Sequence, residues 1–148
     1  MKSRMLVGLG LAFVAIAAVV AAEGVKIEGV KCVVAGSKAA KEANAVDYKG
    51  GKVFFCCQNC PKAFAADTAK FAAKANAQLV ATGQARQAAC PLSGGKLNPE
   101  TKITVNGADV CFCCEKCQAK AKDAADQVEF LFNDKAFEKA GFKVGAAK

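Results

Sequence analysis

The sequence predicts an α+β protein of two tandem small units, each a short β-hairpin followed by helices, after an N-terminal signal peptide. Three observations predict this organisation. An apolar run opens the chain, a cysteine cluster occurs twice about 57 residues apart, and a glycine-containing turn precedes each copy of the cluster. With 148 residues, the chain has the length of one domain or of two small ones.

The first 22 residues have the pattern of a secretory signal peptide. Lys2 and Arg4 give a positive start, residues 6–20 form an uncharged apolar run, and small residues precede Glu23. The run is shorter than the roughly 20 residues that a membrane span needs, although an uncleaved anchor is the alternative. We therefore expect cleavage after Ala22 and a periplasmic or secreted protein with no stable membrane anchor after cleavage.

Each remaining unit begins with a cysteine in a loop and continues into a hairpin. We place the first unit at residues 25–84, with strands at 45–48 and 52–55 around Gly50-Gly51. The second unit, residues 85–148, has expected strands at 102–105 and 109–112 around Asn106-Gly107. Asn-Gly between apolar runs is a strong hairpin signal, because both turn residues must adopt positive φ.

Alanine- and lysine-rich helices are expected after each hairpin. In the first unit they span 61–66 and 67–80, with Asp67 as the N-cap of the second. In the second unit one helix is expected from 118 to 125, continuing to about 133, and another over 134–140. The aromatic and leucine side chains expected to pack in the core are Phe64, Phe71, Leu79, Phe130, Phe132, Phe137 and Phe142.

The cysteine cluster sits where the second strand of each hairpin ends and a helix begins. The two copies are Phe55-Cys56-Cys57-Gln58-Asn59-Cys60 and Phe112-Cys113-Cys114-Glu115-Lys116-Cys117. Cys32 precedes the first cluster by 24 positions and Cys90 precedes the second by 23. Eight of the nine cysteines thus form two equivalent sets. Cys111, which aligns with Phe54, is expected to be either a small buried hydrophobic residue or a ligand at the edge of a site.

This spacing favours a metal ion over disulfide stapling. Cysteines at positions i and i+4 of a helix start lie on one face, where the helix N-terminus stabilises thiolate charge. A third cysteine from the loop would complete each candidate site. The two trios are Cys32, Cys56 and Cys60, and Cys90, Cys113 and Cys117. Cys57 and Cys114 are further candidate ligands, since spacing alone does not decide which member of a vicinal pair binds.

The chain has no histidine, so any metal site would be formed by thiolates. An all-thiolate site suits a soft ion, which favours Cu(I) and leaves Zn²⁺ as the alternative. A disulfide plus a free thiol in each trio is the competing interpretation, because disulfides persist outside the cytosol. The sequence leaves open whether the thiolates form two separate sites or one shared cluster.

Cys90-Pro91, the hairpin and the Phe112–Cys117 cluster resemble the TRASH/YHS family of small metal-binding modules. Those modules carry a cysteine, a gap of about twenty residues, and then two cysteines separated by three residues; here the pattern occurs twice and covers nearly all of the mature chain. The resemblance implies two treble-clef-like units that handle zinc or copper. Four-thiolate relatives have a second cysteine just after the first, where this chain has Ala35 and Ser93.

From these observations we expect an exported protein, not an enzyme, that captures, stores or hands over a soft metal ion. Its partners would be the ion and a metal-donor or metal-acceptor protein. One alternative is a thiol–disulfide oxidoreductase that uses the Cys57–Cys60 and Cys114–Cys117 pairs, which have redox spacing. Another is a structural or interaction module cross-linked by zinc or disulfides, since units this small often need such cross-links.

The charge pattern argues against a nucleic-acid partner. The formal net charge is +8, and it becomes +6 when Lys2 and Arg4 leave with the signal peptide. The lysines are spread along the chain, whereas a nucleic-acid surface needs clustered basic residues beside exposed aromatic ones. Hydrolytic and transferase chemistry also lack support, because the chain offers no histidine base, no glycine-rich phosphate loop before a helix and no evident carboxylate pair.

Overall fold

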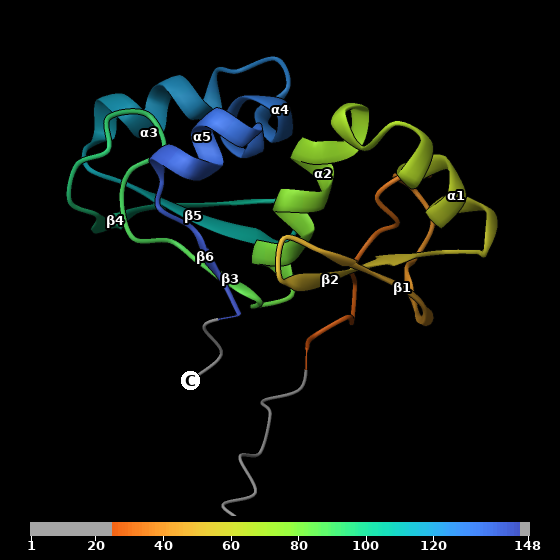
Figure 1. The fold of residues 1–148 in the computed structure, drawn as a ribbon. Coiled ribbons are helices and arrows are strands. Elements are labelled where there is room, and N and C mark those ends of the chain that lie inside the picture. Colours follow the sequence, from red (N-terminus) through yellow and green to blue (C-terminus); the bar gives the residue numbers. More distant parts are fainter. Residues whose placement is uncertain (1–24, 146–148) are drawn as a thin grey trace, which may run out of the picture.

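Within residues 25–145, two antiparallel hairpins and five helices form the α+β fold that the sequence predicts (Figure 1). The computed structural model describes residues 25–145, so the expected signal peptide lies outside the described residues. The first half of the chain contains β1 (Lys41–Tyr48), β2 (Gly51–Phe55), α1 (Asn59–Ala66) and α2 (Thr68–Ala81). The second contains β3 (Ala85–Arg86), β4 (Asn98–Val105), β5 (Ala108–Phe112), α3 (Glu115–Lys122), α4 (Gln127–Phe132), α5 (Asp134–Lys139) and β6 (Lys143–Val144).

Both hairpins have two-residue turns in which both residues adopt positive φ. Asn106 and Gly107 form the second turn, as predicted, with φ of 50° and 80°. The first turn is Lys49-Gly50, with φ of 49° and 84°, so the prediction of Gly50-Gly51 was wrong by one residue. Lysine occupies a left-handed position there at some cost, and the cation is held by contacts described below.

The helices of the second half are shorter than predicted. The expected continuation of one helix to about residue 133 is wrong, because the chain breaks between α3 and α4. The Asp126 side chain accepts a hydrogen bond from the Glu129 N–H and so caps a new helix. The prediction that Phe130 packs in the core is also wrong, since this side chain is 40% exposed. By contrast, Asp67 caps α2 as predicted.

Helix α2 stands between the two halves of the molecule and packs against both (Figure 1). Ala75 and Leu79 face a first hydrophobic cluster, which contains Phe55 and Phe64. Ala73 and Ala77 face a second cluster, which contains Phe112, Phe132 and Leu131. Alanine on both faces permits a close approach of the two halves, so one helix serves two cores.

The end of the chain closes onto the first half. Strand β6 pairs with β3 and places Val144 against the first hydrophobic cluster, in which Phe137 of α5 is buried. Neither short strand was predicted, because two residues carry no detectable periodicity. Within residues 25–145, no helix combines the length and apolar character that a bilayer span requires.

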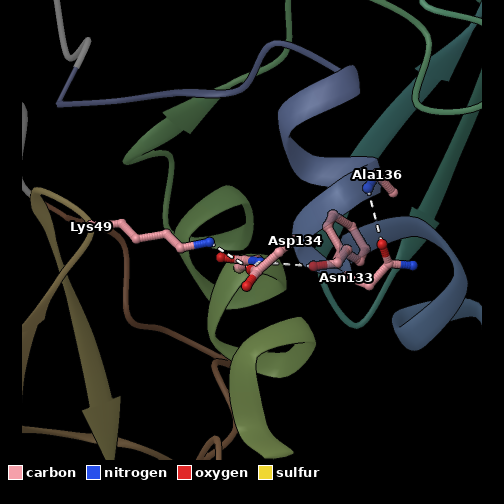
Figure 2. A network of polar contacts seen from close by, with 6 residues as sticks. Lys49, Asn133, Asp134 and Ala136 are labelled. Atoms are coloured by element: carbon pink, nitrogen blue, oxygen red, sulfur yellow. Dashed lines mark hydrogen bonds and ion pairs between the residues drawn. The ribbon is translucent and has the colours of Figure 1, made fainter. Parts of the chain in front are cut away.

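A polar network joins the first hairpin turn to the second half (Figure 2). The Lys49 ammonium lies 2.6 Å from Asp134 Oδ1 and 5.2 Å from the centre of the Phe137 ring. Asn76, fully buried in α2, donates to the same Asp134 oxygen and to the Phe132 carbonyl. Asn133 caps α5 by accepting from the Ala136 N–H. The network therefore fixes the α4–α5 corner against α2 and the hairpin.

Candidate metal centres

The first cysteine of each set lies in a tight loop with the same hydrogen-bond pattern. The Cys32 N–H donates to the Lys38 carbonyl and the Cys32 carbonyl accepts from the Gly36 N–H, both at 2.8 Å. In the second loop, Cys90 makes the corresponding bonds to Gly95 and Gly94, at 2.9 and 2.7 Å. Both thiols are buried, so each loop turns its sulfur inward.

The other cysteines lie at the starts of α1 and α3, after the second strand of each hairpin. The two copies differ in register, because α1 begins at Asn59 whereas α3 begins at Glu115, one position earlier in the repeat. Cys114 is consequently the extended N-cap residue of α3, while Gln58 holds that place before α1.

Two groups of three thiols can each hold a metal ion, and they are the two trios predicted from the spacing. In each group, all three sulfur atoms lie within 4.8 Å of one another. The Cys56 and Cys60 sulfurs are 3.6 Å apart, and those of Cys113 and Cys117 are 3.7 Å apart. Two thiolates on one tetrahedral zinc ion would be about 3.8 Å apart, given a Zn–S bond of about 2.3 Å. The trios therefore have the dimensions of a metal site.

In each trio the pKa of one thiol is lowered and the pKa of another is raised. Burial opposes ionisation of Cys32, but hydrogen bonds from the backbone of Ala35 and Cys56 outweigh it and lower the pKa of Cys32. Burial and the neighbouring thiols raise the pKa of Cys60 to about 12. In a shared site, a second and third negative charge are costly without a cation. Binding of a cation would therefore release protons.

The second trio follows the same pattern. Burial also opposes ionisation of Cys90, yet hydrogen bonds from the Ser93 side chain and from nearby backbone groups lower the pKa of Cys90 to about 6. Burial, with the thiols of Cys113 and Cys114, raises the pKa of Cys117 to about 12. The lowered pKa of Cys90 favours a thiolate in the second loop, which would give an incoming cation an anionic first ligand.

The remaining candidate ligands lie outside the trios. Cys57 is exposed, and its sulfur is 3.4 Å from that of Cys60. Cys114 is also exposed, but its sulfur lies 3.7 Å from that of Cys113. Cys111 belongs to neither group and is half-buried on β5. Each trio thus has one surface thiol beside it, and all nine cysteines are free thiols in the structure.

Glutamine side chains hold the strands that lead to the clusters, and sequence reasoning missed them. Gln78 of α2 accepts from the Phe54 N–H and donates to the carbonyls of Phe54 and Lys31. It therefore ties β2, which leads to Cys56, to the residue before Cys32. Gln87 bonds both backbone groups of Cys111 in the same way. A glutamine on the apolar face of a helix was the available signal for Gln78.

The trios lie at opposite ends of the molecule, as the positions of α1 and α3 show (Figure 1). Helix α2 separates them. The shared cluster that the sequence left open therefore does not form in this arrangement.

Comparisons with protein families, with curated proteins and with solved structures found no match to this chain.

Proposed function

We propose that this protein is an exported metal-binding protein that captures, stores or hands over a soft metal ion at two thiolate sites. Cu(I) is the favoured ion, and Zn²⁺ is the alternative. The observation that carries the proposal is the grouping of Cys32 with Cys56 and Cys60, and of Cys90 with Cys113 and Cys117, each within 4.8 Å. Thiolate ligands select soft ions such as Cu(I) and zinc. The TRASH/YHS resemblance supports the same proposal.

Handover by ligand exchange is supported by the surface thiols. Cys57 is exposed beside the buried Cys60, so its sulfur can meet a partner and a site ligand at once. Cys114 has the same relation to Cys113. An acceptor protein with an exposed thiolate would displace the site's ligands one at a time through these residues, without bond-making catalysis.

The first test is the metal content of the mature chain, purified without oxygen, together with a count of free thiols. We expect two Cu(I) or zinc ions per chain, with thiols that are unoxidised but shielded from alkylation. Finding no metal and eight oxidised cysteines would contradict the proposal and favour a disulfide scaffold.

Serine variants locate the ions. Replacing Cys60 or Cys117 should each remove one ion, and the double variant should remove both, because separated sites give additive losses. The matched control is Cys111→Ser, a cysteine outside both trios, which should keep both ions. Loss of both ions from either single variant would contradict two independent sites.

A thiol–disulfide oxidoreductase is the second candidate, and one observation favours it. Hydrogen bonds, chiefly from the Cys60 thiol, lower the pKa of the exposed Cys57 thiol to about 7. Thiols near this pKa attack disulfides efficiently at neutral pH. A dithiol–disulfide exchange assay decides between the candidates, since a metal carrier should be inactive once its sites are loaded.

A further inference from the structure

The two sites differ in the residue that lies three positions after the first cysteine, which is Ala35 in the first site and Ser93 in the second. Each loop approaches its trio again three residues after the first cysteine, at Ala35 in the first loop and at Ser93 in the second. In the first loop, the Ala35 N–H points at the Cys32 sulfur, 3.4 Å away. Alanine has no side-chain donor or acceptor, so the chain supplies no ligand from that position.

In the second loop, the Ser93 hydroxyl reaches the site. Its oxygen lies 3.1 Å from the Cys113 sulfur and accepts a hydrogen bond from the Gly95 N–H, also at 3.1 Å. Gly95 permits this approach, because a Cβ atom there would lie 3.3 Å from the Ser93 oxygen and 3.5 Å from the Cys113 Cβ. The Gly95 N–H thus holds the Ser93 oxygen beside the trio.

This position is close to that of a fourth ligand. An oxygen and a sulfur bound to one tetrahedral zinc ion are about 3.6 Å apart, given bond lengths of about 2.1 and 2.3 Å. The Ser93 oxygen, at 3.1 Å from the sulfur, needs only a small outward shift to reach that separation. Three sulfurs with one oxygen suit four-coordinate zinc, whereas three sulfurs alone suit three-coordinate Cu(I).

We propose that Ser93 is a specificity-determining residue, which occupies the fourth corner of the second site and makes it the better zinc site of the two. The first site, with Ala35 at that corner, is the better Cu(I) site. The inference rests on the proposed function, because it assigns different ion preferences to the two proposed sites.

The test measures metal binding at both sites in the full chain, with the cysteines of both trios intact. The reduced protein is titrated anaerobically with zinc or with Cu(I) in the presence of a competing chelator. At each point the free cysteines are alkylated, and mass spectrometry reports which trio is protected. Zinc should protect Cys90, Cys113 and Cys117 first, and Cu(I) should protect Cys32, Cys56 and Cys60 first.

Two reciprocal variants and one control isolate the hydroxyl. Ser93→Ala should raise the free zinc concentration that protects the second trio from alkylation by at least about tenfold. This is the effect typical of losing a group that supports a metal ligand. Ala35→Ser should strengthen zinc protection of the first trio. Ser37→Ala is the matched control, since its hydroxyl donates to the Ala35 carbonyl at 3.4 Å, and it should change neither site. A Co²⁺ absorption spectrum gives an independent readout, and the ligand-field bands of the second site should shift in Ser93→Ala.

The outcomes separate the two proposals. If neither ion protects either trio, the metal-binding proposal fails. If both trios are protected but zinc shows no preference, and Ser93→Ala leaves the protection curve and the cobalt spectrum unchanged, the role of Ser93 is overturned while metal binding stands.

Discussion

Cys57 and Cys114 occupy the same place in the repeat, and their sulfur contacts are similar but not identical. The Cys57 sulfur lies 3.4 Å from that of Cys60, and the Cys114 sulfur lies 3.7 Å from that of Cys113. Besides burial, the Cys114 thiol also helps to raise the pKa of Cys117, as the Cys57 thiol does that of Cys60. An exchange path through either surface thiol can therefore reach the last cysteine of its cluster.

The reactivity of the free thiols follows from these surroundings. At pH 7 and without metal, Cys57 should be alkylated much faster than Cys111. Cys57 is exposed with a pKa lowered to about 7, whereas burial raises the pKa of the half-buried Cys111. Timed alkylation followed by peptide mass spectrometry measures both rates in one sample. Equal rates would mean that the hydrogen bonds around Cys57 do not form in solution.

At this scale the sequence predicted the two groups of thiols but not the side chains that support them. Cysteine spacing predicted both trios, because positions i and i+4 of a helix must share a face. The hydroxyl of Ser93 was seen only as a missing cysteine, since its approach to Cys113 depends on the loop conformation. The glutamines were missed because their partners are backbone groups, which the sequence does not specify, although the place of Gln78 on the apolar face of a helix was a signal.

Among the elements, α2 contributes most to the geometry of the first site. It has no cysteine, but Gln78 fixes both the strand and the loop that carry the site's ligands. At β5, Gln87 fixes the strand in the same way, by bonding both backbone groups of Cys111, and it precedes the second loop. Two side chains from non-equivalent positions therefore support equivalent strands.

Replacing Gln78 by alanine should affect the first site selectively. The variant leaves three backbone groups without partners, which should lower the free energy of unfolding by about 2–3 kcal/mol. Metal affinity should fall at Cys32, Cys56 and Cys60 and stay unchanged at the second trio. Denaturant unfolding and site-resolved alkylation measure the two effects. Lys74→Ala, at an exposed position on the same helix, is the control, and an equal effect there would refute a specific role for Gln78.

The hairpins and helix caps show how far element prediction reached. Asn106-Gly107 and the Asp67 cap were predicted because their local chemistry is strong. The turn at Lys49 was missed by one residue, since long-range contacts with Asp134 and Phe137 stabilise its lysine. The break before α4 was missed because Ala119 and Ala121 in α3, and Ala124-Ala125 in the break itself, favour a continuous helix.

For the molecule as a whole, the network around Asp134 makes stability depend on pH. Hydrogen bonds from Lys49 and Asn76 lower the pKa of Asp134 below its ordinary value of 3.8. Ionised Asp134 therefore stabilises the fold above that value, and the contribution disappears as the pH falls through the lowered pKa. The free energy of unfolding of Asp134→Asn should be lower than that of the unsubstituted protein by no more than about 1 kcal/mol at pH 7, since the ion pair is half-exposed.

The difference in free energy of unfolding between the unsubstituted protein and Asp134→Asn should vanish in acid. Denaturant unfolding of the two proteins from pH 7 to pH 2 measures it. Asp47→Asn removes a more exposed ion pair with Lys52, and it serves as the control. A deficit in Asp134→Asn that persists at pH 2 would show that the charge is not its cause.

Phe137 tests whether the halves unfold together. This side chain belongs to α5, yet it is buried in the first hydrophobic cluster. Phe137→Ala should lower the free energy of unfolding by about 3–5 kcal/mol, the range for a buried phenylalanine. Unfolding should remain one transition when it is followed by hydrogen exchange in both hairpins. Exchange that increases in α5 alone would show that the halves are energetically independent.

The long sequence separation between Phe137 and the first cysteines also sets an order of events during synthesis. Cys32, Cys56 and Cys60 emerge well before Phe137 and β6, which pack in or beside the core that holds them. Contacts between such distant segments form late, because closing a long loop is entropically costly. We therefore expect these thiols to be more accessible to metal ions and oxidants until Phe137 and β6 have been made.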